Sequence, residues 1–178
     1  MKKYELTDEY IEIGFVTKIK LYRIKALVAI ASIGVSAGDL GGYVEKESNL
    51  DQSGNAWVYG DAKVYGDAVV YGDAVVSGDA VVYGNAVVCG DAKVYGNAVV
   101  CGDAKVSERS DIVWFSNVGT EYGTLTVFKT KQGVLWATRG CFSGSVEEFL
   151  KKSAEVHDEK TKREYQLLIE VAKSRLGE

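Results

Sequence analysis

GNAWVYGDAKVYGDAVVYGDAVVSGDAVVYGNAVVCGDAKVYGNAVVCGDAKV, residues 54–106, repeats the tripeptide Gly-(Asp/Asn)-Ala nine times at a period of six. A valine stands two positions after each alanine, from Val58 to Val106. Valine between two outward-facing neighbours indicates a short strand with one buried face, which β-branched side chains favour. Glycine followed by Asp or Asn tolerates turn conformations and predicts a corner. The stretch therefore predicts a solenoid of short strands joined by tight corners.

This repeat resembles the hexapeptide-repeat family of left-handed parallel β-helices, in which three hexads make one triangular coil. The resemblance implies that residues 18 apart stack. We therefore predict a mainly β chain, with a left-handed β-helix over 52–109 and a β cap with degenerate first repeats over 1–51. Within that cap, the run Lys18–Lys25 alternates basic and apolar residues as a half-buried strand does. By counting in sixes, Val44 and Leu50 fall in register with the alanines.

Residues 110–178 lose the period and predict a small α+β tail domain of three strands and two helices. Ser145 and Glu148 fit a capping box at the start of the first helix. The second helix is predicted over 158–175, with Leu167, Leu168, Val171 and Ala172 as its buried stripe. The predicted strands are Ile112–Phe115, Leu125–Lys129 and Val134–Thr138.

Motifs at both ends of the chain extend the resemblance. Leu6-Thr-Asp-Glu9, Leu21-Tyr-Arg-Ile24 and Gly38-Asp-Leu-Gly-Gly42 resemble the start of hexapeptide-repeat proteins common in phages and prophages. Gly140-Cys-Phe-Ser-Gly144, Glu147-Glu-Phe149 and His157 resemble a tail domain often joined to them. The resemblance implies a phage setting and brings no settled biochemical activity with it. One role suited to that setting is countering host defence, by binding a host protein or sequestering a small nucleotide signal between subunits.

The outward-facing residues sort onto three faces if residues 18 apart stack. The most apolar face carries Lys63 with Tyr65, Val81, Tyr83, Val99 and Cys101, and another face carries Trp57. Because monomers rarely expose contiguous apolar patches of this size, we predict that this face is a homo-oligomer interface. The family resemblance implies a trimer. The alternative is that valine stands there only because it suits strands.

Composition narrows the function classes. A net charge of −4 argues against nucleic-acid binding, which needs a basic surface. The opening MKKYELTDEY lacks the apolar run of a signal peptide, and no segment is long and apolar enough to span a membrane. The three cysteines form no metal-binding spacing, so we expect a reduced, cytoplasmic protein without metal or cofactor.

Two enzyme readings start from the same single histidine. Acyltransferases with this kind of repeat use a histidine base among the coils, whereas His157 lies outside them. A Cys141–His157 pair would give a thiol nucleophile, although a cysteine beside Phe142 more often only packs. Stacked aspartates at the corners could hold a divalent cation or imitate the phosphates of DNA, but turn geometry alone accounts for aspartate there, and the columns also contain neutral and basic residues.

A polar, glycine-bearing loop in the tail is the candidate binding site. It contains Asn117, Thr120, Glu121 and Tyr122, and Arg139 and Cys141 are expected to approach it. The alternative is an ordinary hairpin turn. The sequence thus favours a non-catalytic trimeric scaffold whose tail displays a recognition surface. The alternatives are a structural spacer or virion-associated protein and, third, an enzyme.

Overall fold

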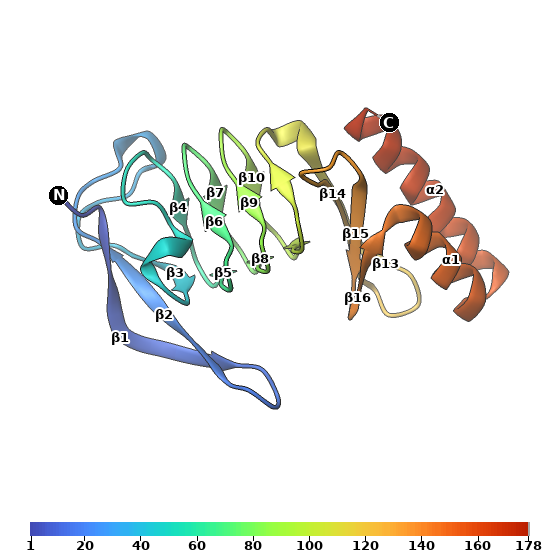
Figure 1. Ribbon diagram of the computed structural model, residues 1–178, viewed down its shortest axis with the longest axis horizontal. Helices are drawn as coiled ribbons and strands as arrows, with labels where there is room; N and C mark the ends of the chain where they lie inside the picture. The colour runs from blue at the N-terminus through green and yellow to red at the C-terminus, as the bar shows by residue number, and fades with distance from the viewer. Residues whose placement is uncertain (178) are drawn as a thin grey trace.

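The computed structural model describes residues 1–177 and shows a parallel β-solenoid of about four turns, with a hairpin at its N-terminal end and an α+β domain at its C-terminal end (Figure 1). The predicted fold class is confirmed. The solenoid strands are β3 (Leu40–Val44), β4 (Trp57–Val58), β5 (Lys63–Val64), β6 (Val69–Val70), β7 (Val75–Val76), β8 (Val81–Val82), β9 (Val87–Val88), β10 (Lys93–Val94), β11 (Val99–Val100) and β12 (Lys105–Val106).

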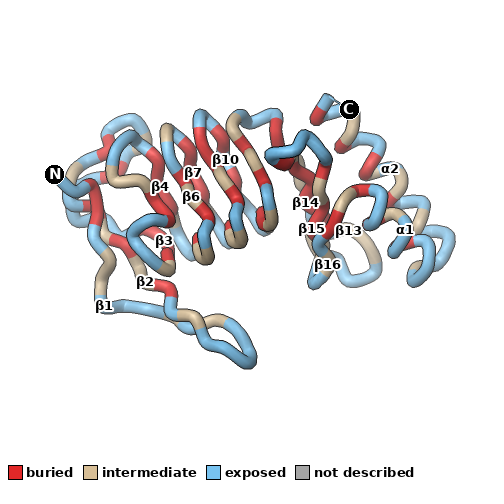
Figure 2. The backbone as a smooth tube through the Cα atoms, viewed as in Figure 1, coloured by how far each residue is buried: buried red, intermediate tan, exposed pale blue. Residues whose placement is uncertain are grey.

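Residues 18 apart pair in three parallel sheets, as predicted. Val64 pairs with Val82 and Val82 with Val100, and the other two sheets run β4–β7–β10 and β6–β9–β12. The repeat valines and alanines are fully buried in one continuous core along the solenoid axis (Figure 2). Each corner glycine has a positive φ, for example 70° at Gly84, which confirms that the corners need left-handed backbone.

The register predicted for the first coil is wrong. Val44 pairs with Val64 and Leu50 with Val70, so both lie in the valine columns and not in the alanine columns. These pairs are 20 residues apart, which means that the first coil holds two additional residues. They fall between Asp51 and Asn55, whose amides donate to Val70 and Gly72 of the next coil.

The two additional residues allow a side chain to reach the N-terminal strand. Gln52 Oε1 accepts from the amides of Lys3 (2.7 Å) and Tyr4 (3.2 Å), and its Nε2 donates to the Tyr4 carbonyl at 3.1 Å. The side-chain amide of Gln52 therefore makes the hydrogen bonds that the backbone of a neighbouring strand would otherwise make with Lys3 and Tyr4.

A hairpin of β1 (Tyr4–Ile13) and β2 (Ile19–Ala26) extends one solenoid sheet to the order β1-β2-β3-β5-β8-β11. Tyr4 packs edge-on against Trp57, with ring centroids 6.2 Å apart. Trp57 is therefore fully buried, and its predicted place on an exposed face is wrong. The Lys3 ammonium donates to the Ala56 carbonyl at 2.7 Å, and burial lowers the pKa of Lys3 to about 8.

The tail domain is a four-stranded antiparallel sheet with two helices packed on it. Its elements are β13 (Ile112–Val118), β14 (Gly123–Lys129), β15 (Leu135–Arg139), β16 (Phe142–Ser145), α1 (Val146–Val156) and α2 (Glu159–Leu176). The Ser145–Glu148 capping box is confirmed. The prediction missed β16, because this short strand contains Gly and Ser and is held by pairing with β15 rather than by its own propensity.

The predicted stripe of α2 is rotated from the real one. The helix buries Thr161, Tyr165, Ile169, Ala172 and Leu176. Leu167 and Val171, which we predicted to be buried, are exposed. Within residues 1–177, no helix has the length and apolar character needed to cross a bilayer.

The tail sheet closes the last coil. The amide of Val99 donates to Thr126 Oγ1 at 3.1 Å, and Thr138 Oγ1 donates to the Val99 carbonyl at 2.8 Å. Phe128 lies in the solenoid core itself. Threonine hydroxyls and one phenyl ring thus replace the next coil that the stack lacks.

Stacking of the corners predicts a large cost for Gly84→Ala. A Cβ at Gly84 would lie 2.9 Å from the Gly102 amide nitrogen, in addition to the roughly 1–2 kcal/mol that left-handed backbone costs an L-residue. Gly133, also at positive φ, has open space around it. We expect Gly84→Ala to lower the free energy of unfolding in urea clearly more than Gly133→Ala; equal losses would contradict close packing of the corners.

Candidate functional site

Four of the six predicted binding residues line one cavity in the tail domain. Thr120, Glu121, Arg139 and Cys141 surround a space of about 230 Å³, together with His157. The other two, Asn117 and Tyr122, line a neighbouring cavity of about 370 Å³, which Thr120 also reaches; its other wall is α2 with the preceding Asp158. The structure thus brings the predicted loop and the β15–β16 turn together.

The end of β13 and the loop that joins it to β14 have unusual backbone. Asn117 and Tyr122 have φ values of 64° and 54°, in the left-handed region that residues other than glycine rarely adopt. The amide of Gly119 donates to Glu164 Oε1 at 2.7 Å, which ties the loop to α2.

Arg139 is the best-defined group of this cavity. Its Nε donates to the Tyr165 hydroxyl at 3.0 Å. Two glycines make room for it: a Cβ at Gly123 would lie 2.8 Å from the guanidinium carbon, and one at Gly119 would overlap the Tyr165 hydroxyl. Among the ion pairs of residues 1–177 none involves Arg139. Its remaining N–H groups are therefore free of a carboxylate partner.

His157 and Cys141 line the same cavity as Arg139. His157 Nδ1 shares a hydrogen bond of 3.0 Å with Ser153 Oγ, and its ring tilts against Tyr165 at 5.4 Å. The hydrogen bonds of residues 1–177 include none between Cys141 and His157. The pair therefore shares a cavity, but the structure does not show the contact that an activated thiol needs.

Helix α1 supplies cavity residues that the sequence reasoning missed. Phe149, Lys152, Ser153 and Val156 all line the cavity. With His157 they follow the spacing of one helix face, at positions i, i+3, i+4, i+7 and i+8. That periodicity was available as a signal, because the capping box already fixed where the helix begins. The lining of the cavity thus includes two cations, several aromatic rings and one carboxylate, a set that suits a small anionic group.

The face predicted as the oligomer interface, here called the tyrosine face, consists of Lys63, Tyr65, Val81, Tyr83, Val99 and Cys101. The rings of Tyr65 and Tyr83 stack with centroids 5.1 Å apart and planes 5° from parallel. Cys101 is only 3% exposed, and its Sγ lies 3.3 Å from Ser143 Oγ of the tail. The chain's own tail covers Cys101, so including it in a subunit interface was wrong. The other five residues remain half-buried.

The corner aspartates form no evident ion site. Residues 1–177 contain no group of three His, Cys, Asp or Glu side chains placed to hold a metal. The one side-chain contact along these columns in that part of the chain is Asn55 Nδ2 donating to Asp73 Oδ1 at 3.1 Å. The corners therefore fit the turn interpretation of the aspartates.

These features define a β-solenoid repeat protein. A family model described as the YdcK beta solenoid repeat matches residues 62–78 and 76–90. The matched residues lie wholly within the coils, so the similarity concerns the repeat and neither the hairpin nor the tail. A search of curated proteins returned no significant match.

Thiol reactivity should separate the three cysteines. Cys141 is exposed, whereas Cys89 and Cys101 are buried. We expect iodoacetamide to modify one thiol per folded chain rapidly and the other two only after denaturation, as measured by intact mass. Cys141→Ser should abolish the rapid modification. A second rapid reaction in the folded protein would contradict the burial of Cys89 or of Cys101.

The tyrosine face predicts alkaline destabilisation. Burial raises the pKa of both Tyr65 and Tyr83 above the ordinary value. Unfolded tyrosines lose their protons at about pH 10, so above that pH the unfolded state binds fewer protons and the free energy of unfolding falls. Urea unfolding from about pH 9 to about pH 11 should show a shallower fall for Tyr83→Phe than for the wild type. The same fall in both would contradict this account.

Proposed function

We propose that this chain is a non-catalytic, homotrimeric β-solenoid scaffold that presents the tail cavity as a recognition site. The proposal rests on the observation that the chain covers both ends of its solenoid but leaves two other surfaces accessible. Its own residues close both ends of the solenoid, through Lys3 and Gln52 at one end and Thr126 and Thr138 at the other. The tail cavity and the tyrosine face, apart from Cys101, remain accessible.

Burial of the tyrosine face in a trimer agrees with its chemistry. Tyr65, Val81, Tyr83 and Val99 form a continuous apolar strip with Lys63 as its single charge. Burying such a strip against another subunit stabilises the assembly by roughly 25 cal/mol per Å² of apolar area removed from water. The trimeric state is what the resemblance to hexapeptide-repeat proteins implies.

The tail cavity suits a small anionic ligand or an acidic segment of a protein. Arg139 offers free N–H groups, and Lys152 adds a second cation at the rim. Together with the resemblance to phage-encoded proteins, this supports a role against host defence in the host cytoplasm. The chain would bind a defence protein or sequester a small nucleotide signal, whose phosphate is the group that Arg139 recognises.

Native mass spectrometry of protein purified gently from its host cells tests this proposal. We expect a trimer carrying a discrete additional mass that Arg139→Ala removes while the trimer persists. Arg163→Ala, at an exposed position of α2 outside the cavity, is the matched control and should keep the mass. A monomer would contradict the scaffold, and a trimer without any added mass would favour the structural spacer or virion-associated role.

An enzyme is the second candidate, because Cys141 and His157 line one cavity. In that case Cys141→Ala would abolish the action of the protein against host defence while the trimer stays intact, whereas Arg163→Ala would not. A binding role predicts that Cys141→Ala leaves the effect largely unchanged, because no contact of the described cavity depends on the thiol.

A further inference from the structure

The N-terminal hairpin extends beyond the solenoid. Strand β3 pairs with β2 only from Tyr22 to Lys25, whereas β1 and β2 continue to pair with each other as far as Ile13 and Ile19. Residues 8–20, here called the arm, therefore project from the body and slant away from the coils, with the tip pointing toward the side on which the tail domain lies (Figure 1). At the tip, Phe15 is 101% and Val16 99% exposed.

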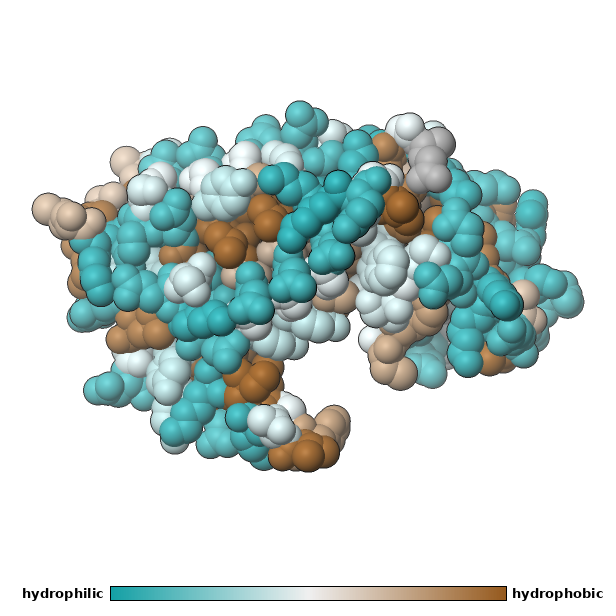
Figure 3. All heavy atoms as spheres, in the orientation of Figure 1, coloured by the Kyte–Doolittle hydropathy of each residue, from teal (hydrophilic) through white to brown (hydrophobic). Residues whose placement is uncertain are grey.

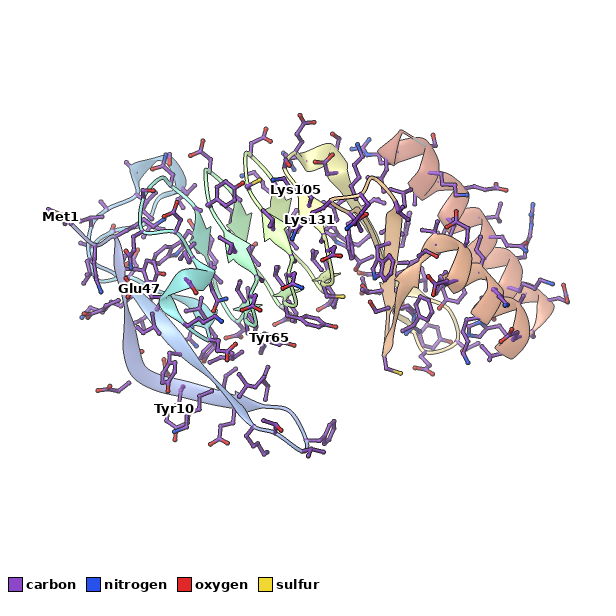
Figure 4. All side chains as sticks on the ribbon, viewed as in Figure 1. Met1, Tyr10, Glu47, Tyr65, Lys105 and Lys131 are labelled. Carbon is purple, nitrogen blue, oxygen red and sulfur yellow. The ribbon has the colours of Figure 1, made fainter. Side chains whose placement is uncertain are left out.

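The shaft of the arm is braced, and its tip is apolar. The rings of Tyr10 and Tyr22 lie 5.9 Å apart across the hairpin, and Lys20 Nζ lies 4.6 Å from the centre of the Tyr10 ring. Figure 3 shows apolar residues at the tip and an open space between the arm and the tail domain. Tyr65 of the tyrosine face lies on the side of the solenoid from which the arm projects (Figure 4). The two exposed apolar side chains at the tip therefore add nothing to the hydrophobic core of their own chain.

We propose that the arm clasps a second copy of this chain, with Phe15 and Val16 packed on the valine and tyrosine rows of the partner solenoid. This inference rests on the homo-oligomer of the proposed function and adds the element that holds the subunits together. The neighbouring subunit then lies between the tyrosine face and the arm of the first subunit.

Charge complementarity favours a second copy as the occupant. As a whole the arm is not cationic, because it carries Asp8, Glu9 and Glu12 against Lys18 and Lys20. Glu9 pairs with Arg23, however, and Glu12 lies opposite Lys20. Lys18, beside the apolar tip, is in none of the ion pairs of residues 1–177. The solenoid repeats the complementary pattern in every turn: rows of valine and tyrosine run between columns of exposed corner aspartates. These are Asp61, Asp67, Asp73, Asp79, Asp91 and Asp103, and only three lysines stand among the repeats. An apolar tip with the cation of Lys18 beside it thus meets an apolar strip flanked by anions.

Two other modes of contact fit the arm less well. Its free edge is β1, which carries Glu5, Asp8, Glu9 and Glu12, and charged side chains on an edge oppose the addition of another strand. Across residues 4–26 these four acids are balanced by Lys18, Lys20, Arg23 and Lys25, so the hairpin lacks the cationic excess that attracts anionic lipid. Contact through the apolar tip with a protein surface remains.

The test compares the full-length wild type with the double variant Phe15→Ser, Val16→Ser by sedimentation velocity over a range of concentrations. We expect the variant to dissociate at concentrations about tenfold or more above those that dissociate the wild type, with an unchanged circular dichroism spectrum. Val171→Ser is the matched control, because it removes a half-exposed valine from α2. It should leave the association unchanged.

Crosslinking in a mixture of ¹⁴N- and ¹⁵N-labelled protein locates the contact. Val16→Cys in a Cys141→Ser background provides one exposed thiol, at the tip of the arm, for a thiol-reactive photo-crosslinker. We expect mixed-isotope crosslinks from the tip to peptides within residues 57–106, because only contacts between two copies join the two isotopes.

The outcomes separate this inference from the proposed function. A wild-type monomer would overturn both. An oligomer that survives the double substitution, or mixed-isotope crosslinks only outside the coils, would overturn the role of the arm alone. Binding of a monomeric wild type to phosphatidylglycerol vesicles through Phe15 would assign the tip to lipid instead.

Discussion

Hydrogen bonding between coils is the constraint on which the rest of this structure depends. Each strand of the repeats is only two residues long, and its amides and carbonyls find partners only in the coils before and after it. Such a stack is stable in its middle and unsatisfied at both ends. The Lys3 ammonium, the Gln52 amide and the hydroxyls of Thr126 and Thr138 satisfy those ends. Among the described residues, no buried side-chain nitrogen or oxygen lacks a partner.

The same constraint explains what the sequence predicted well. In each column a residue packs on the residues 18 positions before and after it, so every member of the column must have a similar size and shape. The sequence of the repeats can therefore hardly vary, and its period of six is visible. Valine at the strand and alanine at the corner could be assigned to the interior without a structure. The first coil was misplaced because its two additional residues, Gln52 and Ser53, break the count, and nothing in the local sequence marks them as an insertion. Burial of Trp57 depended on Tyr4, which is 53 residues away and lies in a strand we did not predict.

The candidate site was predicted to a similar extent and for a similar reason. Polar, glycine-bearing loops can be recognised locally, which is why Thr120, Glu121, Arg139 and Cys141 were found. Residues contributed by helix packing, such as Phe149 and Tyr165, depend on which face of each helix meets the sheet. On α2 the wrong face was chosen, because four aliphatic residues stand close together at 167, 168, 171 and 172, whereas the residues that the sheet buries, at 165, 169, 172 and 176, are spread along the helix and include a tyrosine. Tertiary packing thus decided against the local pattern.

The two-residue insertion in the first coil has a consequence for folding. Nine nearly identical hexads could pair one coil out of step and still bury valine on valine, because every level of the stack looks alike. Gln52 occurs at a single level, where it alone can pair with the backbone of Lys3 and Tyr4. A hairpin docked at another level of the stack would lose that pairing and leave these groups without partners. The irregular coil therefore fixes the level of a repetitive stack at which the N-terminal strand docks.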